Sequence, residues 1–334
     1  GGAILNRGRL TLNYTVFSNN RTALGNGGAV MSFAPSSQLT ISNSSFVGNS
    51  GVLGGALVIQ GDTAASITNS YFDGNSVINL NLTTGSGAVS VDVPLTVSGS
   101  TFVNNNGNSG GAITANAALT IQDSTFRKNK GRHVSGAVLA QKGALNITGS
   151  IFVENLLRIS PSSNSGTIYQ ASVQDLNISN SCIVGNAAPS VFADASSSAR
   201  NAQNNWWGAA DGPNQGVGTG SGDAAGSNMS AAPFLTAPPN SYCPVLVPEP
   251  LPQVAYTLVN TPIEITLSGR GGLPPYIISN VSAPSNGTLT GSGTVFTYTP
   301  NNNFVGGDAF TFRIQGVDGQ YTIGQVTIYV TNPA

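Results

Sequence analysis

A short apolar motif recurs seven times in residues 1–186, and it constrains the fold more than any other feature of the sequence. The motif is L-x-I-x-x-S-x-F-x-x-N, with a hydroxyl two positions before the aromatic residue and asparagine three positions after it. Repeats of this length predict a solenoid, in which each repeat packs only against its neighbours. The aromatic position is held by Phe17, Phe46, Phe72, Phe102, Phe126, Phe152 and, in the seventh repeat, Ile183. The asparagine position is held by Asn20, Asn49, Asn75, Asn105, Asn129, Asn155 and Asn186.

A second apolar segment opens each repeat, as at residues 2–4 (Gly-Ala-Ile) and 111–113 (Gly-Ala-Ile), and its glycine recurs every 24 to 32 residues. The apolar residues alternate over stretches too short for helices and rich in β-branched side chains, which indicates strands. We therefore expect about eight coils of a parallel β-helix, stacked at roughly 4.8 Å. Leucine-rich repeats have a similar period, but a Gly-Ala-Ile strand stands here where they would have a helix.

Stacked coils place equivalent residues in ladders. We expect the leucine, isoleucine and phenylalanine ladders to fill the interior of the solenoid. The asparagine ladder should lie at a corner, where left-handed backbone is tolerated and side-chain amides bond to one another between coils. The spacing varies mainly between the asparagine and the next glycine, so that corner should carry the loops.

These coils resemble the right-handed parallel β-helices of bacterial secreted proteins, which share the pectin-lyase-like fold, and the repeats of polymorphic outer-membrane proteins. The resemblance extends from residue 1 to about residue 245. It implies an extracellular protein. The implied functions are diverse, because the family includes adhesins, autotransporter passengers, surface proteins and polysaccharide-cleaving enzymes.

The repeat weakens after Asn186, where we expect an eighth coil that ends at N-N-W-W-G (204–208). The expected β-helix therefore spans residues 1–208. Two adjacent tryptophans, Trp206 and Trp207, would cover the apolar cross-section at the end of the solenoid. The alternative is a platform on which sugar rings stack.

The chain has two cysteines. Cys182 lies in the seventh coil and Cys243 follows the expected cap. Two cysteines in a secreted chain suggest one disulfide, which would fasten the cap to the solenoid. A metal site or a catalytic thiol has little support, because His133 is the one histidine and is distant in sequence.

Residues 209–252 are expected to form a cap segment and a proline-rich linker, and residues 253–334 a second domain. Short alternating strands separated by turns predict an antiparallel sandwich of about seven strands. The segments 286–289, 298–306 and 308–312 resemble bacterial Ig-like or cadherin-like modules, some of which bind calcium. Candidate calcium ligands are sparse; they are Glu264, Asp308 and Asp318. The expected fold class is thus all-β, a right-handed parallel β-helix followed by an Ig-like β-sandwich.

The low content of charged residues argues against several functions. Lysine, arginine, aspartate and glutamate make up 7% of the chain and the net charge is -1. Nucleic-acid binding and a polybasic membrane patch both need dense basic residues, so neither is expected. No apolar run reaches the roughly 20 residues of a spanning helix. The densest charged run is residues 127–133, which we interpret as a solvated corner rather than a site for an acidic polysaccharide.

An enzyme on this fold needs clustered acid and base groups. The solenoid carboxylates fall at different positions of the repeat and predict no dyad, so we expect no catalytic residues and no cofactor. These carboxylates are Asp62, Asp73, Asp92, Asp123, Glu154 and Asp175.

The expected function is therefore a non-enzymatic structural protein of the cell surface, with a carbohydrate-binding adhesin and a polysaccharide-degrading enzyme as alternatives. Residue 2 already begins a full coil, so we expect an uncovered edge that joins copies head to tail into filaments. An upstream cap removed by processing is the alternative. The expected edge residues are Gly2, Ile4, Leu10, Leu12 and Phe17.

Overall fold

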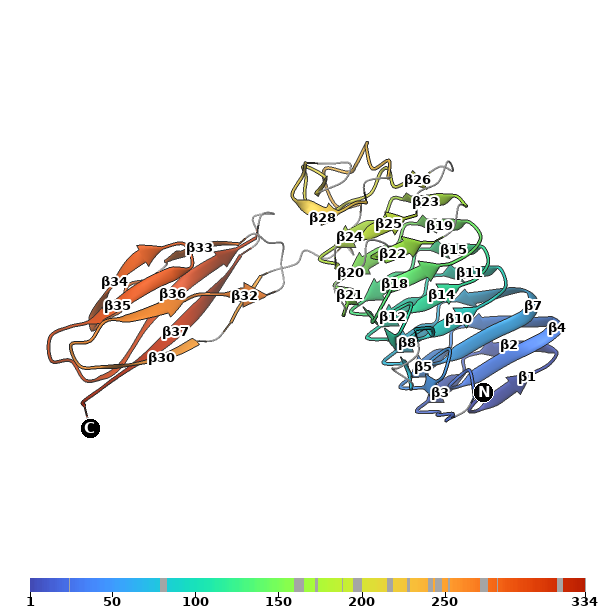
Figure 1. Ribbon diagram of the computed structural model, residues 1–334, viewed down its shortest axis with the longest axis horizontal. Helices are drawn as coiled ribbons and strands as arrows, with labels where there is room; N and C mark the ends of the chain where they lie inside the picture. Colours follow the sequence, from blue (N-terminus) through green and yellow to red (C-terminus); the bar gives the residue numbers. More distant parts are fainter. Residues whose placement is uncertain are drawn as a thin grey trace. The chain divides into compact units, whose positions relative to one another are not determined.

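The computed structural model contains two compact units, Gly1–Pro244 and Val245–Ala334 (Figure 1). It describes residues 1–23, 25–78, 83–158, 165–171, 174–187, 189–194, 200–214, 219–226, 229–239, 243, 248–251, 253–270, 276–280, 282–316 and 321–333. All regular elements in these ranges are strands, and no helix there could cross a membrane. The leucine-rich-repeat alternative, which needs a helix in each repeat, does not fit these residues.

The first unit is a parallel β-solenoid whose strands stack from coil to coil (Figure 1). Its 14-stranded sheet covers two neighbouring faces, because β4 (Val30–Ser42) and β7 (Leu57–Thr68) run through both. One face continues with β1 (Ile4–Asn6), β10 (Val89–Val91), β14 (Ile113–Ala115), β18 (Ser135–Ala140), β22 (Gly166–Gln170) and β25 (Val191–Ala193). The other continues with β2 (Arg9–Asn13), β11 (Leu95–Ser98), β15 (Leu119–Gln122), β19 (Leu145–Thr148), β23 (Leu176–Ser179) and β26 (Arg200–Asn201).

Two further sheets complete each coil. The 7-stranded sheet marks seven coils and carries the phenylalanine positions. Its strands are β3 (Val16–Ser18), β5 (Ser45–Val47), β8 (Tyr71–Asp73), β12 (Thr101–Val103), β16 (Thr125–Arg127), β20 (Ile151–Val153) and β24 (Cys182–Val184). The 5-stranded sheet consists of β6 (Ser50–Gly51), β9 (Ser76–Val77), β13 (Asn106–Gly107), β17 (Lys130–Gly131) and β21 (Leu156–Leu157).

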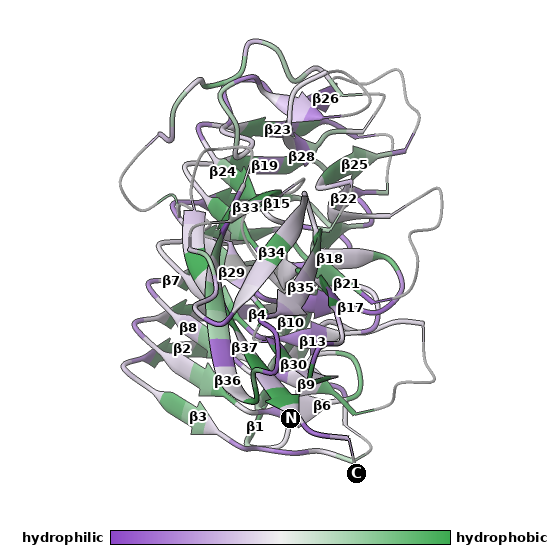
Figure 2. Cartoon of the chain, turned by 90° about the vertical axis from the view of Figure 1, so that its left-hand side faces the viewer, coloured by the Kyte–Doolittle hydropathy of each residue, from purple (hydrophilic) through white to green (hydrophobic). Residues whose placement is uncertain are grey.

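The register is the one that the motif predicts, with Phe72 opposite Phe102 and Phe102 opposite Phe126. Their rings stack inside the solenoid at centroid distances of 4.6 and 4.8 Å, and both partners of Phe102 are fully buried. Leucine and isoleucine ladders fill the rest of the interior. Along these strands buried apolar residues alternate with more exposed ones, and Figure 2 shows hydrophobic and hydrophilic segments next to each other on the strands in view.

Left-handed backbone occurs at two corners of each coil, where the sequence predicted one. In each case the residue with positive φ directly precedes a ladder residue. The first residue makes the turn, and the side chain of the second belongs to the ladder. Before the hydroxyl ladder these residues are Tyr14, Asn43, Asn69, Gly99, Asp123, Gly149, Asn180 and Asn204. Before the asparagine ladder they are Asn19, Gly48, Gly74, Asn104, Lys128, Glu154 and Gly185.

The solenoid extends beyond residue 208, where we expected it to end. An eighth, partial coil pairs β25 with β22 and β26 with β23, and it continues to Trp206, which pairs with Cys182. The chain then loops out through β27 (Pro213–Asn214) and returns at β28 (Gly222–Ala224). Beyond β28, Ala225 pairs with Val191. The returning segment thus covers the partial coil, and stacking does not stop where the repeat motif does.

The second unit is a β-sandwich with a core of buried aromatic and aliphatic residues. Its larger sheet has the order β30 (Gln253–Leu258), β37 (Tyr321–Thr331), β36 (Gly306–Gln315) and β33 (Ile277–Asn280). The other contains β31 (Ile263–Thr266), β35 (Val295–Pro300) and β34 (Gly287–Ser292).

The second unit differs from its prediction in two ways. The pair β30–β37 is parallel, whereas we expected a wholly antiparallel sandwich. In addition, β29 (Glu249–Pro250) lies in the segment expected to be linker, yet it pairs with β32 (Gly269–Arg270). A proline can occupy such a strand because it is short and at an edge, where a missing backbone N–H is tolerated.

Candidate functional site

The asparagine ladder is a continuous chain of side-chain hydrogen bonds along one corner of the solenoid. At Asn105, Oδ1 accepts from the backbone N and the Nδ2 of Asn75, both at 3.0 Å. Its Nδ2 donates to the carbonyl of Phe72 and to Oδ1 of Asn129, both at 3.0 Å. Each inner asparagine therefore uses its full hydrogen-bonding capacity while it is buried, which is the condition for a stable polar group inside a protein.

A ladder of hydroxyl groups follows a second corner. At Ser100, Oγ accepts from the backbone N of Ser70 at 3.0 Å and donates to the carbonyl of Ser98 at 2.9 Å. The backbone N of Ser100 in turn donates to Oγ of Ser124 at 3.1 Å. The ladder satisfies backbone groups that the sharp corner leaves without a strand partner, which explains why this position of the motif is always a hydroxyl.

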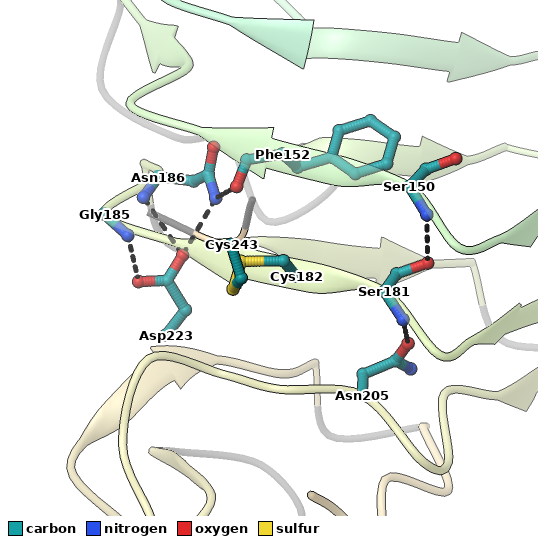
Figure 3. The surroundings of a disulfide bond; sticks show 9 residues. All are labelled: Ser150, Phe152, Ser181, Cys182, Gly185, Asn186, Asn205, Asp223 and Cys243. Atoms are coloured by element: carbon teal, nitrogen blue, oxygen red, sulfur yellow. Dashed lines mark hydrogen bonds between the residues drawn. A yellow bond between two sulfur atoms is a disulfide. The ribbon is translucent and has the colours of Figure 1, made fainter. Parts of the chain in front are cut away.

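Asp223 ends the asparagine ladder (Figure 3). Its Oδ1 accepts from the backbone N of Gly185 at 2.8 Å. Its Oδ2 accepts from the backbone N and the Nδ2 of Asn186, both at 3.0 Å, and from Oγ of Ser190 at 2.9 Å. The last residue of the ladder has nothing further to donate to, so a carboxylate with four incoming donors replaces the amide.

The repeat spacing of the sequence does not predict Asp223. Successive ladder asparagines are 24 to 31 residues apart, but Asp223 follows Asn186 by 37 residues, because the chain loops out after Trp207. The carboxyl is buried, and burial raises its pKa from 3.8 to about 6. Hydrogen bonds from Asn186, Ser190 and Gly185 act in the opposite direction and favour the charged form.

Asn205 ends the hydroxyl ladder. Its Oδ1 accepts from the backbone N of Ser181 at 3.0 Å, and its Nδ2 donates to the carbonyls of Ile178 and Ala202 at 2.8 and 2.7 Å. Asn205 stands two residues before Trp207, the spacing that separates the hydroxyl from the phenylalanine in every coil. Sequence spacing alone could have identified Asn205 and Trp207 as the eighth members of these two ladders.

The structure buries Trp207 completely within the apolar core of the solenoid, while Trp206 is partly buried beside Cys182. A buried ring cannot stack on a sugar. The geometry therefore fits a cap for the end of the solenoid, and it does not fit a sugar platform formed by both tryptophans.

A disulfide joins Cys182 to Cys243, with a Cα–Cα distance of 5.7 Å and a sequence separation of 61 residues (Figure 3). Cys182 lies on β24, directly before the turn whose Gly185 and Asn186 donate to Asp223. One turn of the seventh coil is thus held both by a covalent bond and by a buried carboxylate. We call residues 208–243, which supply both partners, the cap segment.

The first coil has a different environment from the others. Ile4 and Leu10 are partly buried, and Leu12 and Phe17 are 6% exposed, whereas the equivalent residues of the next coil are at most 1% exposed. Gly2 is exposed, although its backbone N donates to Gly27 and Gly28. Strands β1, β2 and β3 each pair on one side within the part of the chain that the structure describes.

The asparagine ladder begins at Asn20 in this coil. Its backbone N and Nδ2 donate to Oδ1 of Asn49 at 3.0 and 2.9 Å. Within the described ranges, no residue donates to Oδ1 of Asn20. Within the described residues the ladder thus runs from Asn20 to Asp223.

Three of the solenoid carboxylates make separate local contacts. Asp73 accepts from Asn104 and Tyr71 at 3.1 Å each. Asp92 accepts from Gln60 and Asn116. Glu154 is paired with Arg127 and Lys128 of the basic run at 3.5 and 3.7 Å. The side chain of Asp62 lies outside the described residues.

The structure describes two of the three candidate calcium ligands of the second unit, Asp308 and Glu264. The carboxylate of Asp308 accepts from the backbone N of Ser285 and of Asn286 and from the hydroxyl of Tyr298, all at 2.9 Å. Glu264 is exposed on β31, and Asp318 lies outside the described residues. Across the described ranges, no group of three or more histidine, cysteine, aspartate or glutamate residues is placed to hold a metal.

Comparison with known protein families gives one match. Residues 244–331 match the model of the bacterial Ig domain, which accounts for the second unit. Neither pectin-lyase-like proteins nor polymorphic outer-membrane protein repeats give a family match, so the resemblance to them is limited to the β-solenoid architecture. A search of curated proteins finds no significant relative. A bacterial Ig domain and a β-solenoid are together consistent with a surface protein.

Proposed function

We propose that the protein is a non-enzymatic structural component of a bacterial cell surface or extracellular matrix. The observation that carries this proposal is the pair of uninterrupted polar ladders, closed by Asp223 and Asn205. Such ladders fix every coil against its neighbours, as in other stacked β-structures. The disulfide supports an oxidising, extracellular location, because such bonds are rare in the cytosol. A long stack of coils next to an Ig domain suits a spacer that bears load.

We further propose that copies of the protein associate with one another through the first coil. Its strand edges and the Oδ1 of Asn20 offer groups that another strand can pair with. The other end of the solenoid is closed by the cap segment, so the C-terminal region of a neighbouring copy supplies the partner surface. A contact of this type joins two different surfaces, and if it does not close into a ring it produces filaments.

Sedimentation velocity and negative-stain electron microscopy test this association. We expect concentration-dependent oligomers or filaments from the intact chain and their loss in Ile4→Asp, because Ile4 points into the partly covered end of the core. Leu5→Asp is the matched control, since Leu5 is on the same strand but is 53% exposed. Monodisperse monomers at high concentration, or equal effects of the two substitutions, would refute assembly through this coil.

Two other functions make different predictions. A polysaccharide-degrading enzyme would release reducing ends or unsaturated products from a panel of polysaccharides, and we expect no release above that of the heat-denatured protein. Sustained release would replace the structural proposal. A carbohydrate-binding adhesin would bind glycans without cleaving them, and one face of the solenoid favours this second candidate.

A further inference from the structure

One outer face of the solenoid presents two rows of uncharged hydroxyl and amide side chains. The face is formed by β2, β4, β7, β11, β15, β19 and β23, and we call it the hydroxyl face. The first row lies between the buried leucine and isoleucine of each motif; it consists of Thr11, Thr40, Ser66, Thr96, Thr120, Asn146 and Asn177. The second row follows the isoleucine; it consists of Asn13, Ser42, Thr68, Ser98, Gln122, Thr148 and Ser179.

The strand register places these side chains in straight lines. Thr96 lies opposite Ser66 and Thr120, and Ser98 lies opposite Thr68 and Gln122. Neighbouring members of a row are therefore separated by the strand spacing of about 4.8 Å, and the two rows by two residues, or about 6.7 Å. All fourteen side chains are exposed or half-exposed, because along each strand they alternate with the residues that point into the interior.

Contacts between members of a row hold several of these side chains in place. Oγ of Ser42 donates to Oδ1 of Asn13 at 3.0 Å, and Nδ2 of Asn177 donates to Oδ1 of Asn146 at 3.1 Å. Threonine adds stiffness, because its branched side chain has few rotamers. A surface arranged before binding loses little conformational entropy when a ligand arrives.

The other outer faces are of a different composition. The outward positions of the 7-stranded sheet include Val47, Val103 and Arg127 among their polar residues. Those of the first face of the large sheet include Leu5 and Met31. Among the described residues, unbroken rows of uncharged hydrogen-bonding side chains therefore occur on the hydroxyl face and not on the other two faces. A surface that was polar overall would not show this difference between faces.

We propose that the hydroxyl face binds a neutral polysaccharide whose chain runs along the solenoid axis. Neither row contains an ionisable side chain, so the rows themselves offer no charge to an acidic polymer; Arg9, two residues before Thr11 on β2, is exposed in the first coil. Its hydroxyls and amides both donate and accept, as do the hydroxyls of a sugar. Contacts repeated at a fixed step favour a polymer over a single sugar, because many weak contacts made together raise the overall affinity. This inference does not depend on assembly through the first coil.

The test is a pull-down and affinity-electrophoresis assay with the full chain. The neutral probes are microcrystalline cellulose, chitin and soluble dextran, and the acidic comparison is polygalacturonate. We expect binding to at least one neutral polymer that changes little between about 50 and about 500 mM salt, because no charges are paired. Glucose and N-acetylglucosamine at millimolar concentration should not compete.

Paired substitutions locate the binding face. Thr96→Glu with Thr120→Glu should lower the affinity at least about tenfold, and Thr96→Val with Thr120→Val, which keeps the shape, should lower it as well. The matched control is Thr101→Glu with Thr125→Glu, which places the same change on the same two coils but on the 7-stranded sheet. An unchanged melting temperature establishes that each variant is folded. Absence of binding to all three neutral polymers, equal losses in both pairs, or binding confined to polygalacturonate would overturn the proposal.

Discussion

At the scale of single residues, the structure explains why the same side chain recurs at one position of the motif and is then replaced. Inside the ladder an asparagine must accept from one coil and donate to the next, and its amide does both. At the end of the ladder Asp223 accepts from Gly185, Asn186 and Ser190. The change from amide to carboxylate therefore follows the number of donors and acceptors that each position needs.

The phenylalanine ladder gives the first prediction. Phe102→Ala should lower the free energy of unfolding by about 3–5 kcal/mol, because it leaves a cavity between two stacked rings. Thr101→Ala, an outward-facing change on the same strand, should cost less than about 0.5 kcal/mol. Urea unfolding followed by tryptophan fluorescence measures both. Equal stabilities of the two variants would contradict the packing of Phe102 between Phe72 and Phe126.

The second prediction concerns pH. A folded-state pKa of about 6 for Asp223 lies above the unfolded value of 3.8, so the folded protein binds the proton more tightly. The resulting stabilisation is fully present below about pH 4 and is lost as pH rises through about 6. Relative to Asp223→Asn, the wild type should therefore lose about 2–3 kcal/mol of stability between pH 4 and pH 7, at about 1.4 kcal/mol per pKa unit.

Urea titrations of both proteins at several pH values measure this difference, and taking the difference cancels the contribution of the other carboxylates. A difference between wild type and Asp223→Asn that stays constant with pH would show that the carboxyl titrates equally in the folded and unfolded states.

At the scale of elements, the predictability of the fold follows from the range of the interactions. Phe102 and Asn105 could be assigned because the motif sets both within one short stretch. Asp223 could not, because the loop after Trp207 removes it from the repeat spacing. The parallel pairing of β30 with β37 is also hidden, since alternation of apolar residues identifies a strand but not the neighbour beside which it lies. The two rows of the hydroxyl face can be predicted from the motif, because they occupy the positions next to its buried leucine and isoleucine.

The cap segment gives the third prediction. Cys182→Ser with Cys243→Ser opens a loop of 61 residues and should lower the stability of the solenoid by about 4 kcal/mol in the chain-entropy model. Limited proteolysis should then cut within the cap segment before it cuts the coils. If reduction and the double substitution both left the protease pattern unchanged, Asp223 and Trp207 would be sufficient to hold the cap segment.

At the scale of the whole molecule, the chain consists of two units with separate cores. The fourth prediction is that they unfold in two transitions, because neither core is completed by the other. Calorimetry of the whole chain and of residues 245–334 alone tests this. The isolated unit should unfold at the temperature of one of the two transitions. A single transition in the whole chain, or failure of the isolated unit to fold, would indicate that the units depend on one another.

The direction of the asparagine ladder has an electrical consequence. The side-chain amides of seven successive asparagines, from Asn20 to Asn186, point the same way, and an amide has a dipole moment of about 3.5 D. Aligned dipoles add, as they do in an α-helix, so the end at Asn186 carries partial positive charge and the end at Asn20 partial negative charge. Asp223 places its carboxylate at the positive end. The aligned amides and the carboxylate therefore attract each other, and the carboxylate offsets the positive end of the ladder dipole.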